Sequence, residues 1–314
     1  MIIGTRGSSL ALAQANIVAG ILEKRGVITS RQIIKTTGDS FTDRPLHELN
    51  GVGAFVRELD ERIISGEIQI AVHSMKDLPT KRPEELSTSA VLMRDSPHDI
   101  LITSDGSKLD DLPQGAIIGT TSMRRRAQIL RYRPDLNIQD LRGNIDTRLK
   151  KLQAGHYDAI MLAEAGLQRM KWDIDIDFER LNPDDFCPSA NQGTIAVVTL
   201  KGSEADTLVS MIDHAPSRIE TQVERIITNE VEGGCVAPVG AFAKISGSGN
   251  EIFARAEVLS LDGSEYIRVE NEIPRDNYRE HALELGRELV GKGAKELVAE
   301  AVCQLSSVRG QQLK

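Results

Sequence analysis

Short apolar stretches alternate with longer amphipathic ones over the first two thirds of the chain, and this alternation predicts strands and helices in turn. The sequence Ile-Ile-Gly-Thr occurs twice, at residues 2–5 and 117–120, and each copy leads into a helix-like segment. Two further apolar stretches, at 66–72 and 155–161, each follow a predicted helix. The repeated order indicates an internal duplication that builds two α/β lobes with mostly parallel sheets.

The last third of the chain has a different order of elements. An irregular stretch at 183–192 precedes a predicted strand at 194–200 and a predicted helix at 217–232. Three strands are expected next, at 239–245, 252–261 and 266–273. A single long helix is then expected from about residue 276 to 305. Strands followed by a helix predict a smaller α+β domain.

The composition limits the kind of ligand. The chain has 314 residues, of which 40% are hydrophobic and 27% charged, so it can form two or three folded domains. Its net charge of −8 argues against a general nucleic-acid coat protein, which needs a basic surface. Arginine nevertheless supplies 25 of the 38 basic residues, and its planar guanidinium binds carboxylates through two donors. This excess is the first indication of an anionic ligand.

The start of the chain, its apolar runs and its cysteines bear on where in the cell the protein is expected. We recognise no signal peptide at the start, and no apolar run approaches the roughly 18 residues of a membrane helix. The three cysteines, Cys187, Cys235 and Cys303, are widely spaced and form neither a disulfide framework nor a metal-type pair. We therefore expect a soluble, cytoplasmic and monomeric protein without a metal site.

The densest chemical signal lies at residues 124–148. This segment holds seven arginines against three aspartates, a local net charge of +4. Arg124 and Arg125 fall in the first turn of a predicted helix, where the helix dipole disfavours cations, so we expect their side chains to bind an anion. A solvated basic face is one alternative. A nucleic-acid helix is another, although only Tyr132 offers an aromatic ring for stacking.

A second candidate segment, residues 73–79, follows a predicted buried strand. Ligands bind at strand ends in α/β sheets, and the pair Lys76 and Asp77 there suits proton transfer or the binding of a cation. The alternative for Asp77 is a turn or helix cap. We expect His73 to be a packed and hydrogen-bonded side chain.

A third candidate is the loop at residues 232–238, where Cys235 follows two glycines. A thiolate on such a loop can act as a nucleophile or as a covalent attachment point. Cys187 and Cys303 are instead expected to be buried packing residues. The glycine-rich residues 50–55 are expected to form a mobile lid.

Together these segments resemble the porphobilinogen deaminase family, also called hydroxymethylbilane synthases. The similar motifs run in order along the chain: GTRGSSLAL at 4–12, AVHSMKD at 71–77, GTTSMRR at 119–125, LRGN at 141–144, TRL at 147–149 and EGGC at 232–235. The resemblance implies a transferase of tetrapyrrole (heme) biosynthesis that joins four porphobilinogen molecules head to tail into linear hydroxymethylbilane and releases ammonia each time. It also implies a dipyrromethane cofactor held by a thioether to Cys235. We expect no nucleic-acid or membrane partner.

The implied fold is α/β, with two lobes like periplasmic binding proteins and a smaller α+β C-terminal domain that carries the cofactor loop. We assign residues 1–92 and 194–211 to lobe 1, which includes the lid and the Lys76–Asp77 segment. Residues 98–186 form lobe 2 with the arginine-rich site, and residues 215–314 form the C-terminal domain.

The resemblance also implies roles for individual residues. Asp77 corresponds to the catalytic carboxylate, which would stabilise the cation left by loss of ammonia and move protons. The cofactor would be held by Cys235, Lys76, Ser122, Arg124 and Arg125. The substrate's acetate and propionate groups and its pyrrole rings would be bound by Arg6, Ser8, Phe55, Thr120, Arg142, Arg148, Arg169 and Gln192.

Four residues depart from those common in the family: Val52, Thr121, Met123 and Asn191. Val52 stands where many members have a lysine, so the expected lid lacks that charge. A noncatalytic carboxylate- or solute-binding protein with the same two lobes is the alternative function, and it predicts reversible binding that does not depend on Cys235.

Overall fold

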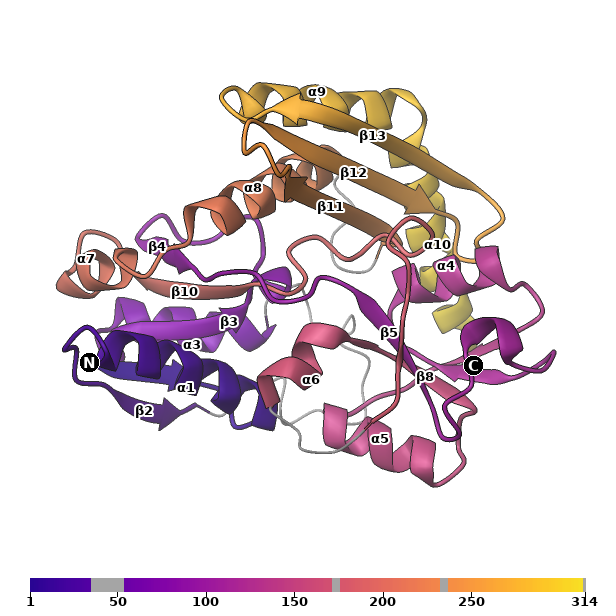
Figure 1. The fold of residues 1–314 in the computed structure, drawn as a ribbon, viewed down its shortest axis with the longest axis horizontal. Helices are drawn as coiled ribbons and strands as arrows, with labels where there is room; N and C mark the ends of the chain where they lie inside the picture. Colours follow the sequence, from indigo (N-terminus) through magenta and orange to yellow (C-terminus); the bar gives the residue numbers. More distant parts are fainter. Residues whose placement is uncertain (35–53, 171–175, 232–236, 313–314) are drawn as a thin grey trace. The chain divides into compact units, whose positions relative to one another are not determined.

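The computed structural model describes residues 1–34, 54–170, 176–231 and 237–312 (Figure 1). The chain divides into two compact units, each made of separate stretches of sequence. Unit 1 consists of Met1–Ser96, Ala165–Asp173 and Gln192–Ile219. Unit 2 consists of Pro97–Glu164, Ile174–Asn191 and Glu220–Lys314. Helices α6 (Glu164–Met170) and α8 (Ala215–Val231) cross the boundary between the units along the chain.

Unit 1 contains a five-stranded sheet in the order β2-β1-β3-β10-β4. Its strands are β1 (Ile2–Thr5), β2 (Ser30–Ile33), β3 (Ile70–Ser74), β4 (Leu86–Val91) and β10 (Ile195–Leu200). Its helices are α1 (Ser9–Glu23), α3 (Ala54–Ile64) and α7 (Glu204–Ser210), and one 3-10 turn, η1 (Met75–Asp77), follows β3. Strand β1 is parallel to β2 and β3, whereas β10 is antiparallel to β3 and β4.

The alternation of side chains along the strands of unit 1 builds two apolar cores. Ile70 and Val72 of β3 pack with residues of α1 and α7 on one face of the sheet. Ala71, between them in sequence, packs with Leu59 and Ile63 of α3 on the other face. Because successive side chains of a strand point to opposite faces, an uninterrupted apolar strand is covered by helices on both sides.

Unit 2 contains a second five-stranded sheet in the order β7-β6-β8-β5-β9. Its strands are β5 (Asp99–Thr103), β6 (Ile117–Gly119), β7 (Asn137–Gln139), β8 (Ala159–Ala163) and β9 (Glu179–Arg180). Helix α4 (Met123–Tyr132) follows β6, helix α5 (Ile145–Gln153) precedes β8, and a short 3-10 turn, η2 (Leu109–Asp111), lies between β5 and β6. The core includes Leu101, Ile118, Ile129 and Met161.

The two sheets share one register, which confirms the internal duplication. In unit 1, Ile3 lies opposite Ile70 in the parallel pair β1–β3. In unit 2, Ile118 lies opposite Ala159 in the parallel pair β6–β8. These residues occupy the same positions of the repeated stretches, the second of Ile-Ile-Gly-Thr and the fifth of the downstream stretch.

The glycine of each repeated tetrapeptide is required by close packing. A Cβ on Gly4 would lie 2.4 Å from Cδ1 of Ile68, and one on Gly119 would lie 2.9 Å from Cδ1 of Tyr157. Such contacts are shorter than side chains tolerate, so both strands keep a residue without a side chain at this position.

The prediction of mostly parallel sheets was wrong, because each sheet has two parallel and two antiparallel neighbouring pairs. In unit 1 the antiparallel strand is β10, and in unit 2 it is β5. Short apolar stretches predict burial, but they carry no information on strand direction, which depends on how the chain returns to the sheet.

The C-terminal part of unit 2 is an antiparallel sheet with helices. Strands β11 (Val239–Ile245), β12 (Glu251–Leu259) and β13 (Tyr266–Pro274) pair in sequence order, and α9 (Tyr278–Gly291) packs on β13 and β12 (Figure 1). The expected single long helix is instead two helices, α9 and α10 (Ala294–Gln312). Gly293 separates them with a φ of 97°, a left-handed conformation that ends a helix. Together with the two sheets described above, these elements confirm an α/β fold of two lobes with a smaller α+β domain.

Candidate active site

The topology of unit 1 brings the predicted site residues to one edge of its sheet. Strands β1 and β3 are parallel, so their carboxyl ends lie together, and antiparallel β10 begins at the same edge. Arg6 and Ser8 follow β1, Lys76 and Asp77 follow β3, and Gln192 precedes β10. Ligand sites in α/β folds lie at this kind of edge.

Ser8 forms the N-cap of α1. Its hydroxyl accepts a hydrogen bond from the backbone N–H of Ala11 at 3.3 Å, which is why the helix begins at this point. The hydroxyl keeps its own proton as a donor for a ligand. The predicted substrate contact of Ser8 is therefore compatible with its structural role.

Lys76 and Asp77 differ in their surroundings. The ammonium of Lys76 donates to Oε1 of Gln192 at 3.3 Å, and Gln192 is buried. Asp77 is exposed at the end of η1, whose N-cap is Ser74, so the carboxylate does not cap this turn. The result is one fixed cation beside one solvent-accessible carboxylate.

Arg169 is buried in unit 1 and bonded to the protein itself. Its Nε donates to Asp95 Oδ2 at 2.7 Å, and its Nη2 donates to the carbonyl of Gly193 at 2.6 Å. Burial lowers the pKa of Arg169, while Asp95 and, more weakly, Asp77 act in the opposite direction. Arg169 therefore connects the segment after β4 to the segment before β10, and it lies in the electrostatic field of Asp77.

His73 was predicted to be packed and hydrogen-bonded, and the structure confirms the packing. The ring is buried, and burial lowers its pKa to about 3, with further contributions from Arg82 and Arg6. Its Nε2, however, has no hydrogen-bond partner among the residues that the structure describes. His73 is therefore a neutral packed side chain and not an acid–base group at neutral pH.

In unit 2 the corresponding edge carries cations and hydroxyls. Thr120 and Ser122 follow β6, Arg142 follows β7, and Asp99 begins β5. Thr120 Oγ1 accepts from the backbone N–H of Ser122 at 3.2 Å. Ser122 in turn caps α4 by accepting from the backbone N–H of Arg125 at 3.5 Å.

Arg124 and Arg125 share one buried carboxylate. Arg124 Nη1 donates to Asp99 Oδ2 at 2.7 Å, and Arg125 Nη2 donates to Asp99 Oδ1 at 2.7 Å. All three side chains are buried. This ion pair compensates the cations in the first turn of the helix, and the burial of both side chains contradicts the alternative of a solvated basic face at these two residues. Sequence reasoning missed Asp99 because a lone aspartate at a strand start has no distinctive pattern.

Arg148 lacks such compensation. Its Nε donates to the carbonyl of Gly143 at 2.8 Å, and no carboxylate pairs with it in the described part of the chain. Burial and the neighbouring Arg125 lower the pKa of Arg148 to about 10. Arg142 differs, because it pairs with Asp140 at 3.4 Å near the surface. A partly buried guanidinium beside another cation is a site that an anion would stabilise.

Several predicted features lie outside the described residues. Among them are Cys235, the residues 50–53 of the expected lid, and the side chain of Phe55. Cys187 is buried as predicted, and burial raises the pKa of its thiol. Cys303 is exposed on α10, so the prediction that it is a buried packing residue was wrong.

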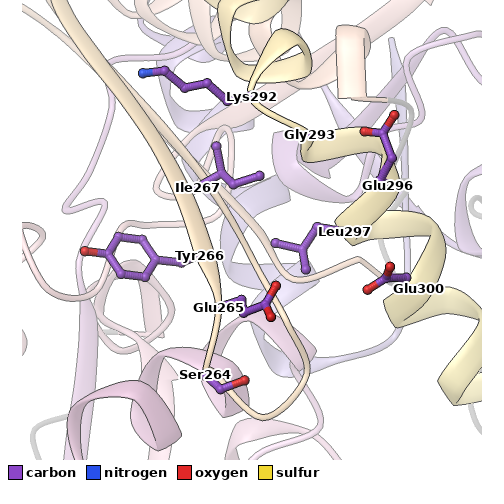
Figure 2. A pocket seen from close by; sticks show the side chains of 9 residues that line it. All are labelled: Ser264, Glu265, Tyr266, Ile267, Lys292, Gly293, Glu296, Leu297 and Glu300. Atoms are coloured by element: carbon purple, nitrogen blue, oxygen red, sulfur yellow. The ribbon is translucent and has the colours of Figure 1, made fainter.

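A cavity of about 500 Å³ lies in unit 2 and contains none of the predicted site residues. Figure 2 shows its lining, which comes from the turn before β13, the start of β13, the link between α9 and α10 with Lys292 and Gly293, and the first turns of α10. Glu265, Glu296 and Glu300 give it an acidic character. An acidic lining does not suit a ligand rich in carboxylates. Across the described ranges, we also find no helix whose length and apolar character would suit a membrane span.

Fold and site define an α/β protein with two equivalent sheets and a cationic edge suited to a ligand with carboxylates. The family model for the dipyromethane cofactor binding domain of porphobilinogen deaminase matches residues 1–207, and that for its C-terminal domain matches residues 219–294. The chain therefore belongs to the porphobilinogen deaminase family, and it has that family's dipyrromethane cofactor binding domain.

Curated relatives cover nearly the whole chain. A probable porphobilinogen deaminase of Methanococcoides burtonii is 63% identical over 98% of this chain and 98% of its own length. A probable porphobilinogen deaminase of Methanosarcina mazei is 60% identical over 98% of this chain and 96% of its own length. The porphobilinogen deaminase of Sulfurimonas denitrificans is 39% identical over 98% and 99%.

Solved structures give a weaker likeness. An ancestral arginine-binding protein bound to arginine is 15% identical, covers 68% of this chain and 89% of its own, and has a TM-score of 0.40. The substrate-binding domain 2 of Lactococcus lactis GlnP is 14% identical over 68% and 85%, with a TM-score of 0.42. Such low values add nothing about ligand or activity, and the fold class rests on the sheets described above.

Proposed function

We propose that this chain is a transferase that joins four porphobilinogen molecules head to tail into linear hydroxymethylbilane, with release of ammonia at each step. The single observation that carries the proposal is the cationic edge of unit 2, where Arg148 is largely withdrawn from water, lies in the electrostatic field of Arg125 and pairs with no carboxylate in the described part of the chain. Each porphobilinogen unit carries two carboxylates, so substrate and cofactor both supply the anions that this edge needs.

The residues at this edge fit a dipyrromethane group. Arg124 and Arg125 would bind its carboxylates, and the hydroxyl of Ser122 would donate a further hydrogen bond. Arg148 and Thr120, at the same edge, would bind the carboxylates of the substrate units. The group, when bound, supplies the covalent primer from which the product chain grows. The protein's contribution is to orient that primer, because forked Arg–carboxylate contacts fix both distance and direction.

Asp77 is proposed as the catalytic carboxylate. Loss of ammonia from porphobilinogen leaves a cation, and a carboxylate close to the pyrrole N–H would stabilise that charge and accept a proton. Asp77 suits this role because it is exposed to an incoming substrate, while Lys76 beside it is held by Gln192. Arg6 and Arg169 are proposed to bind substrate carboxylates near the same edge of unit 1.

Cys235 is proposed as the attachment point of the cofactor. Of the other two cysteines, Cys187 is buried with a raised thiol pKa and Cys303 is exposed, so the chain contains its own controls. We expect the intact mass of the purified protein to exceed the sequence mass by two pyrrole units. The variant Cys235→Ser should lose this adduct and the turnover of porphobilinogen, whereas Cys303→Ser should keep both. An active protein without the adduct would contradict the proposal.

A noncatalytic solute-binding protein predicts a different result for the same variants. It would bind carboxylates reversibly, release no ammonia, and be unaffected by Cys235→Ser. Measuring ammonia release and product formation on one sample separates the two functions. The monomeric state and the cytoplasmic location stay predictions from the sequence.

A further inference from the structure

Buried polar side chains in unit 2 connect α4 to the C-terminal sheet. Glu257 of β12 has no exposed surface. Its Oε1 accepts from Gln128 Nε2 at 2.7 Å, and its Oε2 accepts from Arg131 Nη1 at 3.2 Å and from Arg268 Nε at 2.9 Å. A buried carboxylate needs such partners, so these contacts hold one strand of the C-terminal sheet against α4.

Gln128 extends this connection to Arg124. Its Oε1 accepts from Arg124 Nη1 at 2.8 Å, while its Nε2 donates to Glu257 and to the carbonyl of Cys187. The amide cannot flip, because a flip would place its NH₂ against the guanidinium and its oxygen against the carboxylate. Glu257 therefore fixes the orientation of the group that contacts Arg124.

The backbone shows the same close fit. Gly263 lies in the turn between β12 and β13 with a φ of 73°. A Cβ at this position would lie 2.2 Å from the carbonyl oxygen of Ala127 and 2.6 Å from the backbone nitrogen of Arg131. The turn thus lies directly against the backbone of α4, and a displacement of the C-terminal sheet would be transmitted to this helix.

We propose that Glu257 and Gln128 are positioning residues that set the orientation of Arg124, and through the shared Asp99 that of Arg125, toward the cofactor. The inference rests on the proposed function, in which these arginines bind the dipyrromethane. The C-terminal domain then has two tasks: it carries the attachment cysteine, and its β12 holds the arginines that bind the attached group.

The test uses a charge exchange in the full-length protein. Gln128→Glu places a second carboxylate beside buried Glu257, and like charges in contact repel each other. The double variant Gln128→Glu with Glu257→Gln has the original net charge, because one carboxylate is gained and one is lost. The new amide donates to the new carboxylate and its oxygen still accepts from Arg131 and Arg268. The carbonyl of Cys187 loses the Gln128 donor but keeps its hydrogen bond from Arg124 Nη1 at 2.8 Å. Glu270→Gln is the matched control. Glu270 lies on the neighbouring strand β13 and pairs with Arg255 of β12 at 2.8 Å, without contact to Gln128.

We expect Gln128→Glu to lower kcat/KM for porphobilinogen about tenfold per folded molecule and to leave part of the protein without the two-pyrrole adduct. The double variant should recover kcat/KM to within about threefold of the original protein and carry the adduct fully, as a directly coupled pair requires. Glu270→Gln should match the original protein. Intact mass, kcat and KM measured separately, and thermal melting provide the readouts.

Three outcomes would overturn the inference. In the first, Gln128→Glu keeps normal kcat/KM and adduct. In the second, Gln128→Glu lowers the melting temperature but leaves the activity per folded molecule unchanged, which would mean that Gln128 has only a structural role. In the third, the double variant, which preserves charge and folds, fails to recover. An original protein without adduct and turnover would instead contradict the proposed function, and this inference with it.

Discussion

The two sheets have the same arrangement and register of their three parallel strands, yet their corresponding edges carry different chemistry. In unit 1 the turn after β3 presents Asp77 to solvent beside Lys76. In unit 2 the corresponding turn after β8 leads into α6 without such a pair, and the cations lie after β6, buried around Asp99. Under the proposed function, the duplicated scaffold separates two tasks. The edge of unit 1 with its accessible carboxylate is the reactive edge, and the edge of unit 2 with its buried cations is the holding edge for anions.

The largest expected effect tests the reactive edge. Asp77→Ala should lower kcat at least ~100-fold and leave the melting temperature unchanged, because an exposed side chain contributes to proton transfer but little to stability. Steady-state turnover of porphobilinogen and circular dichroism measure the two properties. Glu84→Gln, another exposed acid of unit 1, is the control. Near-normal turnover of Asp77→Ala would make this carboxylate structural.

The holding edge is tested by Arg148→Gln. Removal of one charge-assisted contact should lower kcat/KM by about 10- to 100-fold and should stall elongation at particular chain lengths. Mass spectrometry of the enzyme–pyrrole intermediates detects the stalled species. Lys150→Gln serves as the control, because Lys150 is an exposed cation on the same helix α5. An unchanged distribution of intermediates in Arg148→Gln would remove this residue from the anion site.

The third prediction concerns the pH dependence of stability and tests His73, a buried group at the end of β3 in unit 1. Folding lowers the pKa of His73 from 6.5 to about 3, so between these values the unfolded chain binds a proton that the folded chain does not. His73 therefore lowers the free energy of unfolding by up to about 1.4 kcal/mol per pH unit as the pH falls below 6.5, and it has no such effect above 6.5.

The comparison needs denaturant melts of His73→Gln and of the unmodified protein between pH 7.5 and 4.5. The variant should lose stability less steeply on acidification than the unmodified protein. The exposed histidine variant His156→Gln should retain the original slope. Equal slopes for His73→Gln and the original protein would show that His73 is not buried and neutral in solution.

The smallest expected effect concerns the connection between the segments that flank the reactive edge. Asp95→Asn removes the negative charge that pairs with Arg169, while Arg169 keeps its bond to the carbonyl of Gly193. If the substitution weakens the binding free energy of porphobilinogen by about 1 kcal/mol, KM should rise roughly fivefold with little change in kcat. Steady-state kinetics measure this split. A fall in kcat with constant KM would place Arg169 in the chemical step instead of in binding.

Local pattern determined much of this protein. The repeated Ile-Ile-Gly-Thr predicted two equivalent lobes, because short apolar strands and the helices after them are encoded within a few residues. Ser8 and Ser122, which follow the two copies of the repeat, both cap the helices that the pattern predicted after each copy. The local pattern also located the exposed Asp77 at a strand end. The motifs together indicated the family, since their order is preserved along the chain.

Tertiary structure alone decided which charges have partners. Arg124, Arg125 and Arg148 look alike in sequence, yet two of them share Asp99 from a distant strand, while Arg148 pairs with no carboxylate among the described residues. Strand direction and the break of the last helix at Gly293 were likewise decided by how the chain returns and packs. The physical reason is that burial and ion pairing are properties of neighbours in space, and sequence spacing reports only neighbours along the chain.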